Sequence, residues 1–199
     1  SIFSGNIFTT KCQTIVNTVN CVGVMGAGIA LECRLRWPEM FGKYTELCSR
    51  HEIDIGKSWL YKTSDRWILN FPTKKHWKDP SREEFLHAGL KEFMRTYNEN
   101  QIGSIAFPLL GAQHGGISPY RSQKIMESYL QKCEIPVEIY KYDPTAIDDL
   151  YGEFKKTLLN MSVEAIKFKT GLRIDYVQRV LDAIDDKSIC QLNRLASID

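Results

Sequence analysis

Apolar and polar positions along the chain predict strands and helices in turn. The β-branched run from Thr14 to Val19 has the composition of a buried strand. Glycines at positions 23, 26 and 28 follow it, and Ile29 to Cys33 then begins a helix. A strand, a glycine loop and a helix start in succession aim backbone N–H groups at a phosphate. This stretch therefore predicts a nucleotide diphosphate site, with Asn17 and Asn20 at its mouth as amides suited to sugar hydroxyls.

The glycine spacing alone does not decide between this site and an ordinary turn. It reads G-x-x-G-x-G, which differs from the dinucleotide pattern G-x-G-x-x-G, and no G-K-[ST] follows as in a P-loop. Any tight strand-to-helix turn also requires glycine. The rest of the chain must therefore distinguish the two interpretations.

The same patterns predict an α/β fold for the first part of the chain. Strand-like segments are expected at residues 1–8, with an interruption at Gly5-Asn6, and at 58–62, 67–71, 102–107 and 137–142. Helices are expected at 28–36, 38–48, 83–97 and 119–132. A capping box at Ser81–Glu84 precedes the third of these helices. Strands that alternate with helices imply a largely parallel sheet between helical layers.

A second glycine loop, residues 108–117, follows the strand expected at 102–107. Ligands of such sheets bind beyond the carboxyl ends of the strands, between neighbouring loops. Both glycine loops follow strands and can lie at the same end of the sheet. Two loops that converge there strengthen the prediction of a diphosphate site.

Pro144 marks an expected boundary between a domain at 1–143 and a helical extension at 144–199. Apolar positions predict three helices in the extension, at about 147–161, 174–184 and 189–195.

Composition narrows the classes of protein further. Among 199 residues, 43% are apolar and the net charge is only +2, so no bulk attraction to nucleic acid is expected. The six cysteines form no C-x-x-C pair or metal spacing, which favours a reducing, cytoplasmic location. We expect neither a membrane span nor a signal peptide.

Three motifs in order resemble those of the macrodomains of DarG antitoxins and, more widely, of the terminal ADP-ribose protein glycohydrolases. They are V-N-T-V-N-C-V-G-V-M-G-A-G-I-A, N-F-P-T-K-K-H-W and F-P-L-L-G-A-Q-H-G-G-I. The resemblance covers about residues 1–143. It implies a three-layer α/β/α macrodomain with a mixed, largely parallel sheet that binds ADP-ribose and requires no metal or redox cofactor.

The resemblance also implies positions for the ligand. Asn6 and Ile7 would lie at the adenine end, where many macrodomains carry Asp in place of Asn6, and Asn17 and Asn20 would face the distal ribose. One phosphate loop would be formed by Val24, Met25, Gly26, Ala27 and Gly28. The other would be formed by Gly111, Ala112, Gln113, His114, Gly115, Gly116 and Ile117. Tyr142 and Asp143 would form the edge of the site at the adenosine.

The catalytic lysine of these relatives corresponds to Lys74. Its amine could attack the distal C1″, or its ammonium could protonate the leaving group, and the sequence leaves both open. Protein-directed relatives carry an aspartate that would fall near Gly115 and is absent here. Its absence favours the DNA-directed branch.

Lys74 begins a basic segment that has two interpretations. It could be a solvated loop, or Lys75, His76, Trp77 and Lys78 could contact DNA, with Trp77 stacked on a base.

The expected function is hydrolysis of ADP-ribose from modified DNA bases, thymidine in single-stranded DNA, which would counteract a DNA ADP-ribosyltransferase toxin. An ADP-ribose reader without turnover is one alternative. Another is a hydrolase of protein-linked ADP-ribose or of small ADP-ribose esters. The helical extension could bind the toxin or brace the sheet.

Overall fold

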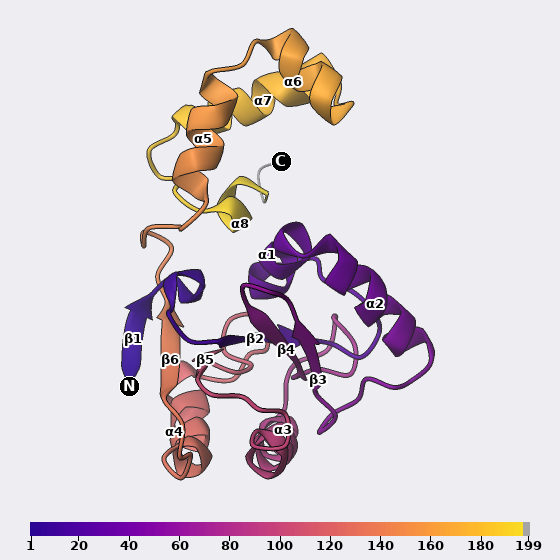
Figure 1. The fold of residues 1–199 in the computed structure, drawn as a ribbon, viewed down its shortest axis with the longest axis vertical. Coiled ribbons are helices and arrows are strands. Elements are labelled where there is room, and N and C mark those ends of the chain that lie inside the picture. The colour runs from indigo at the N-terminus through magenta and orange to yellow at the C-terminus, as the bar shows by residue number, and fades with distance from the viewer. Residues whose placement is uncertain (197–199) are drawn as a thin grey trace. The chain divides into compact units, whose positions relative to one another are not determined.

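Six strands form one mixed sheet in the computed structural model, which describes residues 1–196 (Figure 1). They are β1 (Ile2–Gly5), β2 (Thr14–Val19), β3 (Trp59–Lys62), β4 (Trp67–Pro72), β5 (Ile105–Pro108) and β6 (Val137–Tyr142), in the spatial order β1-β6-β5-β2-β4-β3. β1, β6, β5, β2 and β4 are parallel neighbours, whereas β3 is antiparallel to β4. The five parallel strands therefore end at the same edge of the sheet.

Helices cover both faces of this sheet, as Figure 1 shows. On one side lie α1 (Gly28–Arg36) and α2 (Pro38–Ser49), and on the other α3 (Glu83–Thr96) and α4 (Pro119–Leu130). Successive residues of a strand point to opposite faces, so Ile15 enters the core beneath α1 and α2 while Val16 enters the core of α3 and α4. The expected three-layer architecture is confirmed.

Local patterns located most of these elements correctly. The predicted strand at 14–19, helix at 28–36 and strand at 137–142 agree with β2, α1 and β6. The segment at 1–8 differs, because after β1 it turns into a short 3-10 helix, η1 (Ile7–Thr9), capped by the Asn6 side chain.

The capping box expected at Ser81–Glu84 is wrong. The N-cap of α3 is Arg82, and no side chain caps this helix. Ser81 instead turns toward the second glycine loop, where its N–H donates to the Gly115 carbonyl at 2.9 Å. Packing against a distant segment outweighs the local capping signal here.

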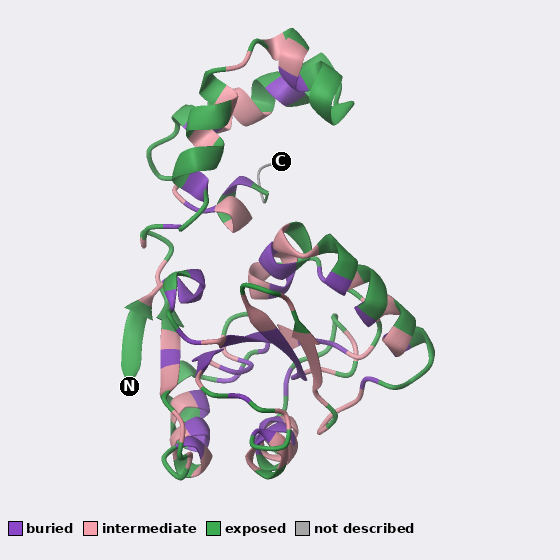
Figure 2. Ribbon diagram, in the orientation of Figure 1, coloured by how far each residue is buried: buried purple, intermediate pink, exposed green. Residues whose placement is uncertain are grey.

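The chain divides into two compact units, Ser1–Tyr142 and Asp143–Asp199. The second contains α5 (Tyr151–Leu159), α6 (Val163–Thr170), α7 (Ile174–Asp185) and α8 (Leu192–Leu195), with a small core at Tyr151, Ile184 and Leu195. The sequence did not predict α6, because it has no apolar stripe: Ile166 is buried, but Phe168 is 91% exposed. Figure 2 shows how much of these helices is exposed.

None of the helices within residues 1–196 combines the length and apolar character needed to cross a lipid bilayer.

Contact between α3 and the sheet depends on one glycine, which gives a test of the fold. A Cβ at Gly89 would lie 2.2 Å from Cζ of Phe71, which is fully buried on β4. We predict that Gly89→Ala lowers the free energy of unfolding by about 1–3 kcal/mol through overpacking. The matched control is Gly42→Ala in α2, where a Cβ meets nothing within 4 Å and should stabilise by about 0.5–1 kcal/mol. Urea unfolding measures both, and an unchanged midpoint for Gly89→Ala would contradict this packing.

Candidate functional site

Five loops follow the five parallel strands and lie side by side along one edge of the sheet. In spatial order the first residues beyond the strands are Asn6 after β1, Asp143 after β6, the second glycine loop after β5, the first glycine loop after β2, and Thr73 after β4. The row spans four strand spacings, about 19 Å at about 4.8 Å each. The structure thus gathers residues from three distant motifs into one elongated site.

Asn20 shapes the first glycine loop, residues 20–28. Its side-chain oxygen accepts from the N–H groups of Val22 (3.0 Å) and Val24 (3.3 Å), and its amide donates to the Val24 carbonyl at 2.6 Å. The Tyr44 hydroxyl donates to the Asn20 carbonyl at 2.6 Å. Burial raises the pKa of Tyr44, which keeps this donor protonated. Asn20 therefore uses its side chain to hold the loop.

Asn17 lies in the core, away from the mouth of the loop. Its side chain is fully buried and donates to Asn70 of β4 at 2.9 Å. Met25 is buried next to it, with its sulfur 3.8 Å from the Asn17 amide nitrogen. Of the residues expected to form the first phosphate loop, Val24, Gly26 and Ala27 are exposed and Gly28 is half-buried.

The second glycine loop, residues 109–117, is close-packed at Gly115. A Cβ there would lie 2.3 Å from the Gly111 carbonyl oxygen and 2.4 Å from the Ser81 hydroxyl oxygen. Any side chain at this position would collide with the backbone of the loop. The loop is also fixed at its base, where the buried Ser122 hydroxyl donates to the Leu110 carbonyl at 2.8 Å.

The two glycine loops meet at the start of α1. A Cβ on Gly28 would lie 3.1 Å from the His114 ring, so His114 stands directly against the first turn of the helix. The N-cap of α1 is Ala27, which provides no side-chain cap. The first N–H groups of the helix therefore remain available to an anion, and the helix dipole favours negative charge there.

Lys74 extends to the second glycine loop. Its ammonium donates to the His114 carbonyl, and it lies 3.5 Å from the Trp77 carbonyl oxygen. Lys74 is half-buried, and its side chain forms no ion pair with a carboxylate in the part of the chain that the structure describes. The structure thus places one lysine at the junction of the two loops.

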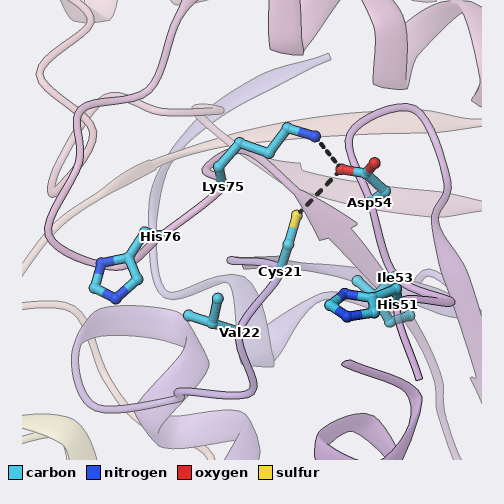
Figure 3. Close-up of a pocket in the computed structure, with 7 residues that line it drawn as sticks. All are labelled: Cys21, Val22, His51, Ile53, Asp54, Lys75 and His76. Atoms are coloured by element: carbon cyan, nitrogen blue, oxygen red, sulfur yellow. Dashed lines mark hydrogen bonds and ion pairs between the residues drawn. The ribbon is translucent and has the colours of Figure 1, made fainter. Parts of the chain in front are cut away.

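A second set of contacts fixes the basic loop, residues 73–78, against the first glycine loop (Figure 3). The Cys21 N–H donates to the Lys75 carbonyl at 3.1 Å, and the Cys21 thiol donates to the Lys74 carbonyl at 3.3 Å. The Lys75 ammonium pairs with Asp54, which also accepts from the Cys21 thiol at 3.8 Å. We call Cys21, Asp54 and Lys75 the thiol clasp.

The charges of the thiol clasp suit a structural role. Burial, then the Asp54 carboxylate, raises the pKa of the Cys21 thiol to about 11, so the thiol stays protonated as a donor. The hydrogen bond from Lys75 lowers the pKa of Asp54, which remains ionised. The clasp thus carries one neutral donor and one closed ion pair.

The last three residues of the basic loop, residues 76–78, are exposed or half-buried. His76 stacks on Trp77 with ring centroids 5.6 Å apart, and Trp77 is 49% exposed. The Lys78 ammonium lies 5.0 Å from the centre of the Trp77 ring. An exposed aromatic ring flanked by a cation is the combination that stacks on nucleobases.

At the opposite end of the row, Gly5 of β1 pairs with Tyr142 of β6. Asn6 and Tyr142 are therefore brought together, as expected of one binding edge. The Asn6 oxygen accepts from the Phe8 N–H at 3.0 Å, while its buried amide nitrogen has no hydrogen-bond partner within the described residues. Ile7 is buried beside it.

Several residues of this site carry no signal in the sequence. Asp54 is a lone carboxylate between a helix and a strand, and it meets Lys75 only through tertiary structure. Asn70 and Tyr44 sit in patterns that predict core packing, and their polar groups find partners only in the fold. No cluster of three metal-ligating side chains occurs in residues 1–196.

Comparison with known proteins agrees with this architecture. The Macro domain family model matches residues 16–126. A DNA ADP-ribosyl glycohydrolase of Mycobacterium tuberculosis is 41% identical over 142 residues, which are 69% of this chain and 40% of that protein. The chain therefore spans about 40% of the length of this curated relative.

Two solved structures are similar in fold and sequence. The macrodomain of Mycobacterium tuberculosis DarG superposes with a TM-score of 0.66 at 40% identity, covering 70% of this chain and 97% of that one. Thermosipho africanus DarTG in complex with ADP-ribose gives a TM-score of 0.67 at 34% identity, covering 70% of this chain and 40% of that one. The matching family model, the order of the strands in the sheet and these similar proteins all agree. The chain therefore belongs to the Macro domain family, among the macrodomains of DarG proteins.

Proposed function

We propose that this chain removes ADP-ribose from modified DNA bases by hydrolysing the N-glycosidic bond at the distal ribose. The observation that carries the proposal is the meeting of Lys74 with both glycine loops through His114 and Gly28. It puts a cationic amine next to two sets of backbone N–H groups. The relatives named as DNA ADP-ribosyl glycohydrolases support the same reaction.

ADP-ribose would lie along the row of strand ends. Its adenine would be near Asn6, Ile7 and Tyr142, and its diphosphate would lie between residues 24–28 and residues 111–117. The open start of α1 favours the negative charge of the diphosphate. The distal ribose would then reach Lys74, because β4 lies beyond β2 in the strand order.

Lys74 could act in either of two ways at the distal ribose. As an amine it would form a bond to C1″ while the bond to the base breaks, and water would then release ADP-ribose. As an ammonium it would donate a proton to the leaving base, while water attacks C1″. In both cases a second N–H of Lys74 can keep its hydrogen bond to the His114 carbonyl, which would hold the amine in place.

Close packing of the second glycine loop supports DNA over protein as the substrate. The protein-directed relatives carry an aspartate near position 115, and no side chain fits there in this conformation. The exposed Trp77 and the basic side chains Lys75, His76 and Lys78 provide groups that can contact a nucleic-acid strand. Thymidine in single-stranded DNA is the proposed substrate.

The proposed reaction would reverse the modification made by a DNA ADP-ribosyltransferase toxin. A fusion protein of Thermosipho africanus that joins a DNA ADP-ribosyl transferase to such a glycohydrolase supports this pairing. The helical unit lies outside the matched residues 16–126, and toxin binding is one role for it. The free thiols of all six cysteines favour a reducing, cytoplasmic location.

A substitution of Lys74 distinguishes the proposed hydrolase from a protein that binds ADP-ribose without hydrolysing a bond. We predict that Lys74→Ala lowers the rate of ADP-ribose release from an ADP-ribosylated oligonucleotide by at least about 100-fold, the usual worth of a positioned acid or base. Its affinity for free ADP-ribose, measured by calorimetry, should change by only a few fold, since the loops are unchanged. Equal rates for the variant and the unmodified protein would contradict a catalytic role.

Lys74→Arg distinguishes the two mechanisms, since it keeps the positive charge and removes the nucleophilic amine. If Lys74→Arg loses ADP-ribose release as completely as Lys74→Ala, the amine attacks C1″. If substantial release remains, a positive charge at this position is sufficient for the reaction. Lys91→Ala, a change of an exposed lysine on α3, is the control for loss of one surface charge.

The identity of the substrate is tested by a direct comparison. ADP-ribosylated single-stranded oligonucleotide and ADP-ribosylated protein are incubated with the chain, and released ADP-ribose is measured. We predict release from the oligonucleotide at least about tenfold faster, because position 115 lacks a carboxylate. Preference for the protein would overturn the proposed substrate.

A further inference from the structure

A second hollow, of about 320 Å³, is lined in part by the three residues of the thiol clasp. Its walls are formed by Cys21, Val22, His51, Ile53, Asp54, Lys75 and His76 (Figure 3). This volume is at the lower end of the range typical of small-ligand pockets. None of the ADP-ribose positions proposed above lines it.

The hollow adjoins Lys74 through the backbone. Lys75 and His76 follow Lys74 directly in the chain, and the thiol of Cys21, which also lines the hollow, donates to the Lys74 carbonyl at 3.3 Å. A molecule in the hollow would therefore lie next to the group bonded to the distal ribose. That group is the base released in the proposed reaction.

The lining has the chemistry of a nucleobase site. Two imidazoles, His76 and His51, stand on either side of Val22 in Figure 3, and each offers a flat ring for stacking. Val22 and Ile53 provide an apolar wall. Asp54 Oδ1 already accepts from Lys75, Ile55 and Cys21, and Oδ2 is the Asp54 oxygen that could accept from an exocyclic amino group.

Charge on the basic loop, which continues from the hollow through Trp77 to Lys78, favours a polyanion. Asp54 is neutralised by Lys75, whereas Lys78 forms no ion pair with a carboxylate anywhere in residues 1–196. Trp77, 49% exposed, continues the stacking surface along the basic loop. Successive aromatic faces with cations beside them are typical of grooves for single-stranded nucleic acid.

We infer that this hollow binds a base of the DNA strand adjacent to the ADP-ribosylated one, so that the enzyme holds the strand on the leaving-group side of Lys74. The inference rests on the proposed function and names the part of the substrate that the ADP-ribose cleft does not hold. It predicts that the chain discriminates between an ADP-ribosylated strand and an ADP-ribosylated mononucleoside.

Two kinds of variant test the hollow by changing side chains alone, and the Val22 N–H that donates to Asn20 is kept. Val22→Trp fills it from a side chain that is 47% exposed and has room to grow. His51 has a positive φ of 57°, which Asn and Asp tolerate, so His51→Asn and His51→Asp both remove the imidazole without added backbone strain. This pair differs only in charge.

The measurement is the KM and kcat of ADP-ribose release from an ADP-ribosylated 10-mer (about 10 nucleotides, within the range that single-strand sites span) and from the ADP-ribosylated mononucleoside. We expect Val22→Trp to raise KM for the strand at least about tenfold more than KM for the mononucleoside, which corresponds to the loss of one stacked base. His51→Asp should raise KM for the strand more than His51→Asn does. The difference between the two KM values should shrink as the salt concentration rises.

Unchanged KM for the strand in Val22→Trp and both His51 variants would overturn the inference, as would equal losses on strand and mononucleoside. If the unmodified protein releases ADP-ribose from neither substrate, the proposed function itself fails. In that case the affinity of each variant for unmodified single-stranded DNA, measured by fluorescence anisotropy, decides the inference by the same tenfold criterion. Thermal unfolding of each variant confirms that the fold is retained.

Discussion

Parallel pairing of the strands is the constraint on which the site depends. Because β1, β6, β5, β2 and β4 run in the same direction, residues from three distant motifs reach one edge of the sheet. The central strand β2 separates β5 from β4. Its glycine loop therefore has the second glycine loop on one side and the basic loop on the other, and a ligand along this edge meets binding groups before it meets Lys74.

Internal polar contacts hold the loops at this edge, while the start of α1 carries no side-chain cap. Asn20 satisfies the turn with its own side chain, and Asn17 pairs with Asn70 inside the sheet. The Asn17 NH2 group thereby avoids a desolvation penalty of about 1–3 kcal/mol, whereas Asn17 Oδ1 is buried without a hydrogen-bond partner in the described residues. The start of α1 is left without a side-chain cap, so its N–H groups are available to a ligand. The atoms that hold this loop in place therefore differ from those left uncapped at the start of α1.

Local patterns predicted the fold well because each element of the sheet unit has a strong periodic signal. Thr14–Val19 is buried and β-branched, and the glycines after it punctuate the chain clearly. The patterns failed where tertiary contacts decide. Ser81 resembles a helix cap and packs on Gly115 instead, and α6 lacks an apolar face. The thiol clasp joins residues 21, 54 and 75. Because these residues lie far apart in the sequence, no sequence motif indicates that they are in contact. Asn17 looked like a ligand group because its amide is polar, whereas the sheet uses it in the core.

The central claim is that ADP-ribose lies along the strand ends with its distal ribose at Lys74. A crystal structure of the chain soaked with ADP-ribose tests it most directly. The account predicts the diphosphate between residues 24–28 and 111–117, the adenine beside Asn6 and Tyr142, and C1″ within reach of the Lys74 amine. A ligand bound in the reverse direction, or with its distal ribose away from Lys74, would contradict it.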